Sequence, residues 1–200
     1  MDNINSGPPF RKAFFLILLS GLSYLFLDRE FVSLIGKDPL PLWKAFSFLI
    51  YPPLHLLLWA GTFIIARIKQ SRWTLPLFEI TVSQCLSVAF ARVFKILIGR
   101  ARPDIFLKKG IYGFQGLEWN HHYHSFPSGH TLTAFTLATS LSYLFPRFRI
   151  LFYTSASLLS LSRPFLLDHY LSDVIATASI GMIIASFVHI LTRRIHYETT

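Results

Sequence analysis

Cysteine and charged side chains are scarce in this chain. Cys85 is the one cysteine among 200 residues, so the sequence allows no intrachain disulfide and no zinc site built on cysteines. Charged residues make up 14% of the chain, whereas soluble domains carry about 25%. Apolar residues make up 52%. A chain with so little polar surface needs lipid or a large partner to cover it, and we expect a membrane protein.

Acidic residues are also few. Ten Asp and Glu stand against 19 Lys and Arg, which gives a formal net charge of +9. A nucleic-acid-binding domain would carry such an excess as a basic patch on a polar surface. Here the basic residues lie mostly between long apolar stretches, where membrane proteins place them. We therefore predict a lipid bilayer setting and an anionic substrate, with no nucleic acid and no protein partner.

Six apolar segments approach the length that crosses a bilayer core, which is roughly 20 residues for about 30 Å. They are 12–28, 44–67, 76–99, 130–146, 148–164 and 170–192. The predicted fold is all-α, a bundle of six transmembrane helices in a single domain, 1–200. The proline pair Pro52-Pro53 should kink the second span. Arg11 and Lys12 are typical of a signal peptide, but no small-residue cleavage site follows, which favours an uncleaved first helix.

One predicted connection is long, at residues 100–129 between the third and fourth spans. Long loops without obvious structure are often functional. With six spans, this loop lies on the face opposite both termini. The two faces carry similar numbers of Lys and Arg, so the positive-inside count alone does not decide the orientation. When the cations that could be catalytic are discounted, we expect cytoplasmic termini. The loop would then face the periplasm, outside a bacterial inner membrane.

Three polar clusters fall on this same face of the six-span arrangement. The first ends the third span, where Lys95 and Arg102 are seven residues apart, two helical turns, and Pro103 follows. We expect both cationic side chains on one face of the helix end, ready to bind an anion. Cationic anchors at a membrane interface produce the same pattern.

The second cluster, Pro127-Ser128-Gly129-His130, opens the fourth span. Backbone N–H groups at a helix start, together with the positive end of the helix dipole, bind anions. Gly129 would allow the anion a close approach to the backbone. An ordinary helix cap followed by an interfacial histidine is the alternative interpretation.

The third cluster, Ser162-Arg163 followed by Asp168-His169 and Asp173, precedes the sixth span. His169 and Asp173 are four residues apart, and such residues are neighbours on a helix. A carboxylate that accepts the proton of one imidazole nitrogen leaves the other nitrogen free to attack. A helix-capping aspartate beside a surface histidine would give the same pattern.

Together the clusters read K-x6-RP at 95–103, PSGH at 127–130 and SR-x5-H-x3-D at 162–173. This pattern resembles the three-part signature of the type 2 phosphatidic acid phosphatase superfamily, with every signature position present and in order. The resemblance implies a membrane phosphatase that works through a phosphohistidine, without a metal or other cofactor. It implies catalytic roles for His169 as nucleophile, Asp173 as its orienting partner, and His130 as acid and base. It implies phosphate binding by Lys95, Arg102, Ser128, Gly129 and Arg163.

No metal site is predicted. Asp104, Asp168 and Asp173 do not form the kind of carboxylate cluster that holds Mg²⁺ with phosphate. The histidines at 121, 122 and 124 invite a metal reading, but a loop without cysteine or a paired carboxylate is more typical of substrate contact or solvation. Arg100 is expected to touch a head group or to anchor a phospholipid. Glu79 has no predicted role.

Other functions fit parts of the pattern. Vanadium-dependent haloperoxidases share the signature but are soluble. A transporter or channel would line a path with charges near the bilayer centre, whereas these charges lie at span ends. A catalytically silent lipid-binding protein would not need the complete set of catalytic residues that the signature contains. Polyprenyl pyrophosphate, phosphatidylglycerol phosphate, phosphatidic acid and lipid A phosphates all fit as substrates, and the 104–126 segment is expected to select among them.

Overall fold

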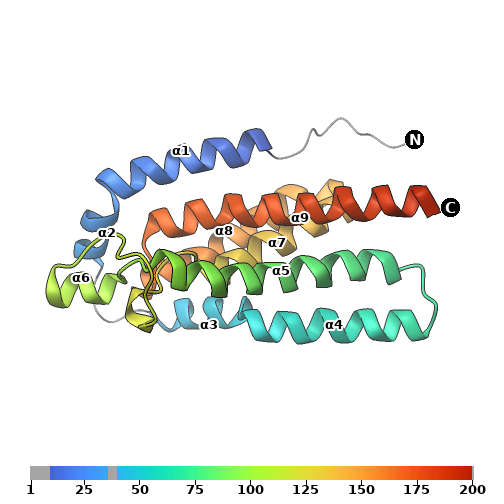
Figure 1. Ribbon diagram of the computed structural model, residues 1–200, viewed down its shortest axis with the longest axis horizontal. Helices are drawn as coiled ribbons and strands as arrows, with labels where there is room; N and C mark the ends of the chain where they lie inside the picture. Colours follow the sequence, from blue (N-terminus) through green and yellow to red (C-terminus); the bar gives the residue numbers. More distant parts are fainter. Residues whose placement is uncertain (1–9, 36–39, 200) are drawn as a thin grey trace.

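The structure, a computed structural model, describes residues 10–35 and 40–199, and the regular secondary structure in these ranges is helical. The α-helices are α1 (Phe10–Phe26), α2 (Asp28–Leu34), α3 (Pro41–Leu49), α4 (Pro52–Ile68), α5 (Thr74–Ile98), α6 (Pro103–Lys109), α7 (Gly129–Leu144), α8 (Arg149–Phe165) and α9 (Leu171–Thr199) (Figure 1). Two short 3-10 helices are η1 (His121–Tyr123) and η2 (Pro146–Phe148). The predicted all-α class is confirmed.

Three helical stretches of the described chain are long and apolar enough to cross a membrane. They are Pro41–Ile68, Thr74–Ile98 and Leu171–Ile195. The other three predicted spans are helical but short, because α1, α7 and α8 contain 17, 16 and 17 residues. The count of six spans is therefore not confirmed, although each of the six predicted segments forms helix.

The second predicted span contains a break rather than a kink. Proline lacks a backbone N–H and disfavours helical dihedral angles in the residue before it. Tyr51 accordingly has extended angles, with φ −66° and ψ 116°, and separates α3 from α4. His55 Nε2 lies 2.7 Å from the backbone oxygen of Leu49, a contact across this break.

The helix α9 lies at the centre of the bundle and packs against α1, α5, α7 and α8 (Figure 1). α7 and α9 approach closely at Gly181, where an added Cβ would lie 3.1 Å from the Cβ of Phe135. Close approach through small residues is typical of helix packing in membranes. Glu79, for which the sequence predicts no role, links α5 to α9 through a 2.9 Å contact with His189 Nδ1.

The short helices α2 and α6 lie at the end of the bundle where α5 ends and α9 begins (Figure 1). Lys95 is in the last turn of α5 and Arg163 in the last turn of α8. His130 and Asp173 are in the first turns of α7 and α9. Antiparallel packing thus gathers the three sequence clusters at one end.

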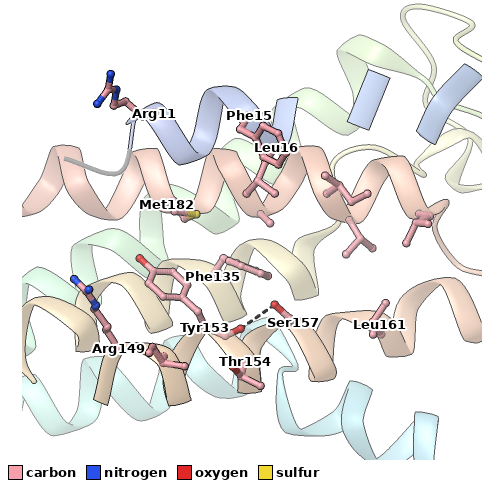
Figure 2. A pocket seen from close by; sticks show the side chains of 15 residues that line it. Arg11, Phe15, Leu16, Phe135, Arg149, Tyr153, Thr154, Ser157, Leu161 and Met182 are labelled. Atoms are coloured by element: carbon pink, nitrogen blue, oxygen red, sulfur yellow. Dashed lines mark hydrogen bonds between the residues drawn. The ribbon is translucent and has the colours of Figure 1, made fainter. Parts of the chain in front are cut away.

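A mostly apolar groove of about 860 Å³ is lined by α1, α7, α8 and α9. Arg11 and Arg149 lie at one end of it, and Phe15, Phe135 and Met182 line its middle (Figure 2). The groove continues towards Leu161 (Figure 2), and Leu171 also lines it. These two residues are each two positions along the chain from a signature residue, Arg163 and His169 respectively.

Candidate active site

A helix end divides the first cluster. Lys95 lies in α5, which ends directly before Gly99, and Gly99 has a left-handed conformation with φ 55°. An added Cβ on Gly99 would lie 2.0 Å from the backbone oxygen of Gly116, so glycine is required here. Arg102 lies beyond this point, as the N-cap of α6. The prediction that Lys95 and Arg102 share one helix face is therefore wrong, because Gly99 ends the helix first.

The 100–129 loop is held in place by its own backbone. Arg102 N–H donates to the backbone oxygen of His122 at 2.9 Å, and Ser125 N–H donates to that of Arg100 at 3.0 Å. The side chain of Arg102 also lies 3.1 Å from His121 Nε2. The positive charge of Arg102, followed by partial burial, lowers the pKa of His121. A neutral His121 accepts this hydrogen bond and so steadies the guanidinium.

Ser128 caps α7 and turns inward. It is 0% exposed, and its backbone N–H donates to Thr177 Oγ1 at 3.1 Å. Its hydroxyl accepts a hydrogen bond from Thr131 Oγ1 at 3.0 Å. Ser128 thus has the contacts of an ordinary helix cap, and its phosphate contact stays a prediction. Gly129 and His130 follow it at the start of α7 and are only partly buried.

His169 lies in the turn between α8 and α9 and is 2% exposed. Its Nδ1 makes a short contact with the backbone oxygen of Ser125. Because a carbonyl oxygen only accepts, Nδ1 carries the hydrogen, and Nε2 of the neutral ring keeps its lone pair. Burial, followed by the charges of Lys95, Arg163 and Arg102, lowers the pKa of His169 well below its ordinary value. The neutral form of His169 is therefore the stable one in this turn.

Asp173 contacts His169 indirectly, and the predicted direct hydrogen bond between them is wrong. The carboxylate of Asp173 turns back to the start of α9, where Tyr170 N–H donates to it at 2.9 Å. The hydroxyl of Ser125 also donates to it, at 2.6 Å. Ser125 thus bridges the pair, with its hydroxyl on Asp173 and its carbonyl oxygen on His169.

Arg100 lies inside the protein, and both predicted roles for it, a head-group contact and a phospholipid anchor, are wrong. It is 2% exposed and forms ion pairs with Asp173 and, at 2.7 Å, with Asp28. Its Cζ lies 4.6 Å from the ring centre of Tyr170 and 4.9 Å from that of Tyr24. Burial opposes the charge, but Asp173 and Asp28 outweigh burial and raise the pKa of Arg100. Arg100 is a permanent internal cation.

Asp28, at the start of α2, completes this buried network. It is 0% exposed and accepts hydrogen bonds from the backbone N–H of Ser172 at 2.9 Å and from its hydroxyl at 2.5 Å. Tyr112 Oη lies 3.1 Å from its carboxylate. Nothing in the three sequence clusters points to Asp28. The one available signal is an acidic residue directly after an apolar segment.

Two of the predicted phosphate-binding cations share a carboxylate. Asp168 Oδ2 lies 2.8 Å from Arg163 Nη2, and Asp168 Oδ1 lies 3.2 Å from Arg102 Nη1. Arg163 also makes a short hydrogen bond to the hydroxyl of Ser47 on α3. The pattern therefore brings Arg102 and Arg163 together next to His169, with Asp168 between them.

The loop histidines do not converge on one point. His122 Nδ1 lies 3.5 Å from a carboxylate oxygen of Asp104, whereas His124 Nε2 lies 3.0 Å from the backbone oxygen of Glu118. In residues 10–35 and 40–199, no group of three His, Cys, Asp or Glu side chains is arranged to hold a metal ion. The structure thus gives these histidines separate partners.

Comparison with known proteins finds curated relatives and similar structures. Lipid A 1-phosphatases of Rhizobium johnstonii and Rhizobium etli are each 40% identical over 91 residues, 46% of this chain. The match covers 37% and 39% of those proteins, so the chain spans well under half the length of these curated relatives. The crystal structure of Aquifex aeolicus LpxE has a TM-score of 0.55 at 27% identity, over 81% of this chain and 94% of that one.

A second solved structure supports the fold alone. It is a transmembrane PAP2-type phosphatidylglycerolphosphate phosphatase from Bacillus subtilis, with a TM-score of 0.58 at 18% identity, over 94% of this chain and 97% of that one. The profile of the PAP2 superfamily matches residues 76–197, more than half of the chain and the whole of the three clusters. On this match, and on the similar folds, the chain belongs to the PAP2 superfamily.

Proposed function

We propose that the chain is an integral membrane phosphatase that hydrolyses a lipid phosphate through a phosphohistidine on His169. The observation that carries this proposal is the hydrogen bond that orients the imidazole of His169. The Nδ1 of His169 is held by the backbone oxygen of Ser125, which leaves Nε2 as the free nucleophile. The charges of Lys95, Arg163 and Arg102 act on the same imidazole and, after burial, lower its pKa.

In the first step, Nε2 of His169 forms a bond to phosphorus while the bond from phosphorus to the lipid oxygen breaks. Lys95, Arg102 and Arg163 neutralise the charge on the remaining phosphate oxygens. The partly buried start of α7 at Gly129 adds the positive end of a helix dipole. His130 gives its proton to the departing oxygen, so the lipid leaves as an alcohol, or as a phosphate if the substrate is a pyrophosphate.

In the second step, water hydrolyses the phosphohistidine. His130 takes a proton from the water, whose oxygen bonds to phosphorus as the P–N bond to His169 breaks. Inorganic phosphate leaves, and both histidines regain their starting states. Throughout, Asp173 holds the hydroxyl of Ser125 so that the Ser125 carbonyl stays on the imidazole. The three cations supply charge neutralisation, and we propose that turnover needs no metal ion.

A lipid A phosphate is our preferred substrate among the four lipid classes that fit. The 40% identity to two lipid A 1-phosphatases supports this choice. An acyl chain would lie in the apolar groove, whose lining extends to Leu161 and Leu171 at the ends of α8 and α9 where the site lies. We propose that the site faces the periplasmic side of a bacterial inner membrane.

The test replaces His169 by alanine in the purified full chain and measures phosphate release from each of the four lipids in detergent. We expect the wild-type protein to release phosphate, fastest from lipid A, and His169→Ala to release none above background. His55→Gln, a change outside the site, should keep wild-type turnover. Undiminished turnover by His169→Ala would rule out the nucleophile. Full loss of wild-type turnover in EDTA would rule out the metal-free mechanism.

Phosphate release also separates this proposal from a transporter or channel. A transporter would carry the lipid or ion and release no phosphate from it. Vanadate, which mimics the phosphoryl transition state, should inhibit the wild-type protein. Acid quenching during turnover should trap an acid-labile phosphoryl group on the wild-type chain and none on His169→Ala.

A further inference from the structure

Asp168 occupies an unusual place beside the proposed nucleophile. It directly precedes His169 in the chain, and its two carboxylate oxygens contact two different arginines, at 2.8 Å for Arg163 and 3.2 Å for Arg102. The two arginines are 8% and 11% exposed, whereas Asp168 is 34% exposed. An anion that joins two nearly buried cations is thus itself open to water on one side.

The hydrogen-bond partners of both guanidinium groups show what a phosphate would have to displace. Arg102 donates through Nη1 to Asp168, and its Nη2 lies beside His121. Arg163 donates through Nη2 to Asp168 and through Nη1 to Ser47. Of these partners, only Asp168 carries a negative charge. The Nε atoms of both arginines are buried and have no hydrogen-bond partner in the described residues, so a phosphate would bind them through their terminal nitrogens. There it competes with the Asp168 oxygens that accept from Arg163 Nη2 and Arg102 Nη1.

We propose that Asp168 is an internal counter-ion, which holds the phosphate position on Arg102 and Arg163 until the substrate phosphate displaces it. The inference rests on the proposed function, because it assigns Asp168 to the same phosphate site. When the product phosphate forms, the carboxylate competes for the two arginines again and weakens product binding. Asp168 thereby sets the affinity of the site for free phosphate.

The contacts favour a displaceable counter-ion over a fixed support. Ser47 and His121 each keep one guanidinium in place when Asp168 leaves, so the two arginines retain their positions. The exposed side of Asp168 lets its carboxylate move into water without being buried unpaired, a step that would otherwise be costly. A fixed support would have its charge enclosed, as Asp173 does at 0% exposure.

The test measures anion binding directly, without turnover. Inorganic phosphate and vanadate are titrated into the purified full chain in detergent by calorimetry, and thermal unfolding is followed at each concentration. Asp168→Asn keeps the shape and removes the charge, and we expect it to bind both anions about tenfold more tightly. Asp168→Ser should also bind both anions more tightly. This second variant controls for a folding defect that is specific to Asp168→Asn. Asp168→Glu, which keeps the charge, should stay close to the wild-type protein.

Asp104→Asn is the matched control. Asp104 is 31% exposed at the same end of the bundle, and its carboxylate contacts Lys108 and His122. It acts on Arg102 only through its charge, without a hydrogen bond to that side chain, so this variant should tighten phosphate binding much less than Asp168→Asn does. Unchanged or weaker phosphate binding by both Asp168→Asn and Asp168→Ser overturns the counter-ion and makes Asp168 a support for the arginines. A wild-type protein that binds neither anion and releases no phosphate instead overturns the proposed function itself.

Discussion

Replacing Arg100 by glutamine should destabilise this protein severely. The change removes the cation shared by Asp28 and Asp173, both of which are 0% exposed. Glutamine can still donate hydrogen bonds through its amide, but it neutralises neither carboxylate. The 2.9 Å hydrogen bond from Arg100 to Ser172 is also lost. Two buried negative charges are then left close together without a counter-ion.

The size of the effect follows from the burial of all three groups. Removing one partner of a buried ion pair costs about 3–5 kcal/mol, because the other charge stays buried and uncompensated. For a chain of this size, each kcal/mol shifts the melting temperature by roughly 2–4 °C. We therefore expect Arg100→Gln to lower the melting temperature by roughly 6–20 °C.

The assay is thermal unfolding of purified variants in one detergent, followed by intrinsic fluorescence. Asp28→Asn and the double variant Arg100→Gln/Asp28→Asn complete a cycle. The double variant removes one of the two stranded carboxylates, so its destabilisation should be smaller than the sum of the single changes. Arg67→Gln, an exposed change at the end of α4, should melt within about 2 °C of the wild-type protein.

Two results would refute this reasoning. Arg100→Gln melting together with Arg67→Gln would mean that water or lipid reaches the cluster and screens its charges. Strict additivity in the cycle would mean that Arg100 and Asp28 do not act on each other, despite their 2.7 Å separation.

Two further predictions concern the backbone and the protonation of the site. Gly99→Ala should lower the melting temperature, because the left-handed φ of 55° disfavours a side chain and the Gly116 oxygen occupies the place of the Cβ. Gly61→Ala is the control and should not lower it, because an added Cβ there meets nothing within 4 Å. Equal melting temperatures for the two variants would contradict this prediction. Because the pKa of His169 is lowered by burial and then by nearby cations, the unfolded chain takes up a proton before the folded one. The free energy of unfolding that neutral His169 contributes is therefore complete above about pH 6.5 and is lost as the pH falls below that value. Between pH 7.5 and 5, the melting temperature of the wild-type protein should fall more steeply than that of His169→Ala. Parallel plots of melting temperature against pH for the two proteins would contradict this prediction.

Helix ends explain which parts of the site could be predicted. Lys95, Arg163, His130 and Asp173 lie within one turn of the end of an apolar helix. Apolar length indicates where such a helix stops, and alternating helix directions bring these ends to the same side. Two predictions that assumed regular helical spacing were wrong. Gly99 ends α5 early, and Asp173 turns back to its own helix start instead of reaching His169.

Residue spacing along the chain does not predict the contacts of Ser125, Asp28 and Asp168. Ser125 is 44 residues from His169, and Asp28 is 144 residues from Ser172. Such contacts depend on how the loop and α2 close over the helix ends, and many chain paths are compatible with the same local pattern. Arg100 illustrates the consequence, because a cation next to a membrane span was expected at the lipid surface and instead neutralises two buried acids.

The sequence by itself determined the all-helical class, the apolar segments and the signature residues, since these depend on residue type and on spacing along one helix. Tertiary structure alone decided that Ser125 holds His169, that Arg100 joins Asp28 to Asp173, and that Asp168 lies between Arg102 and Arg163. The physical reason is the range of the interactions. Helix formation and the apolar pattern depend on residues within a few turns of one another in the sequence. The partner of a buried charge depends instead on which distant segment packs against it.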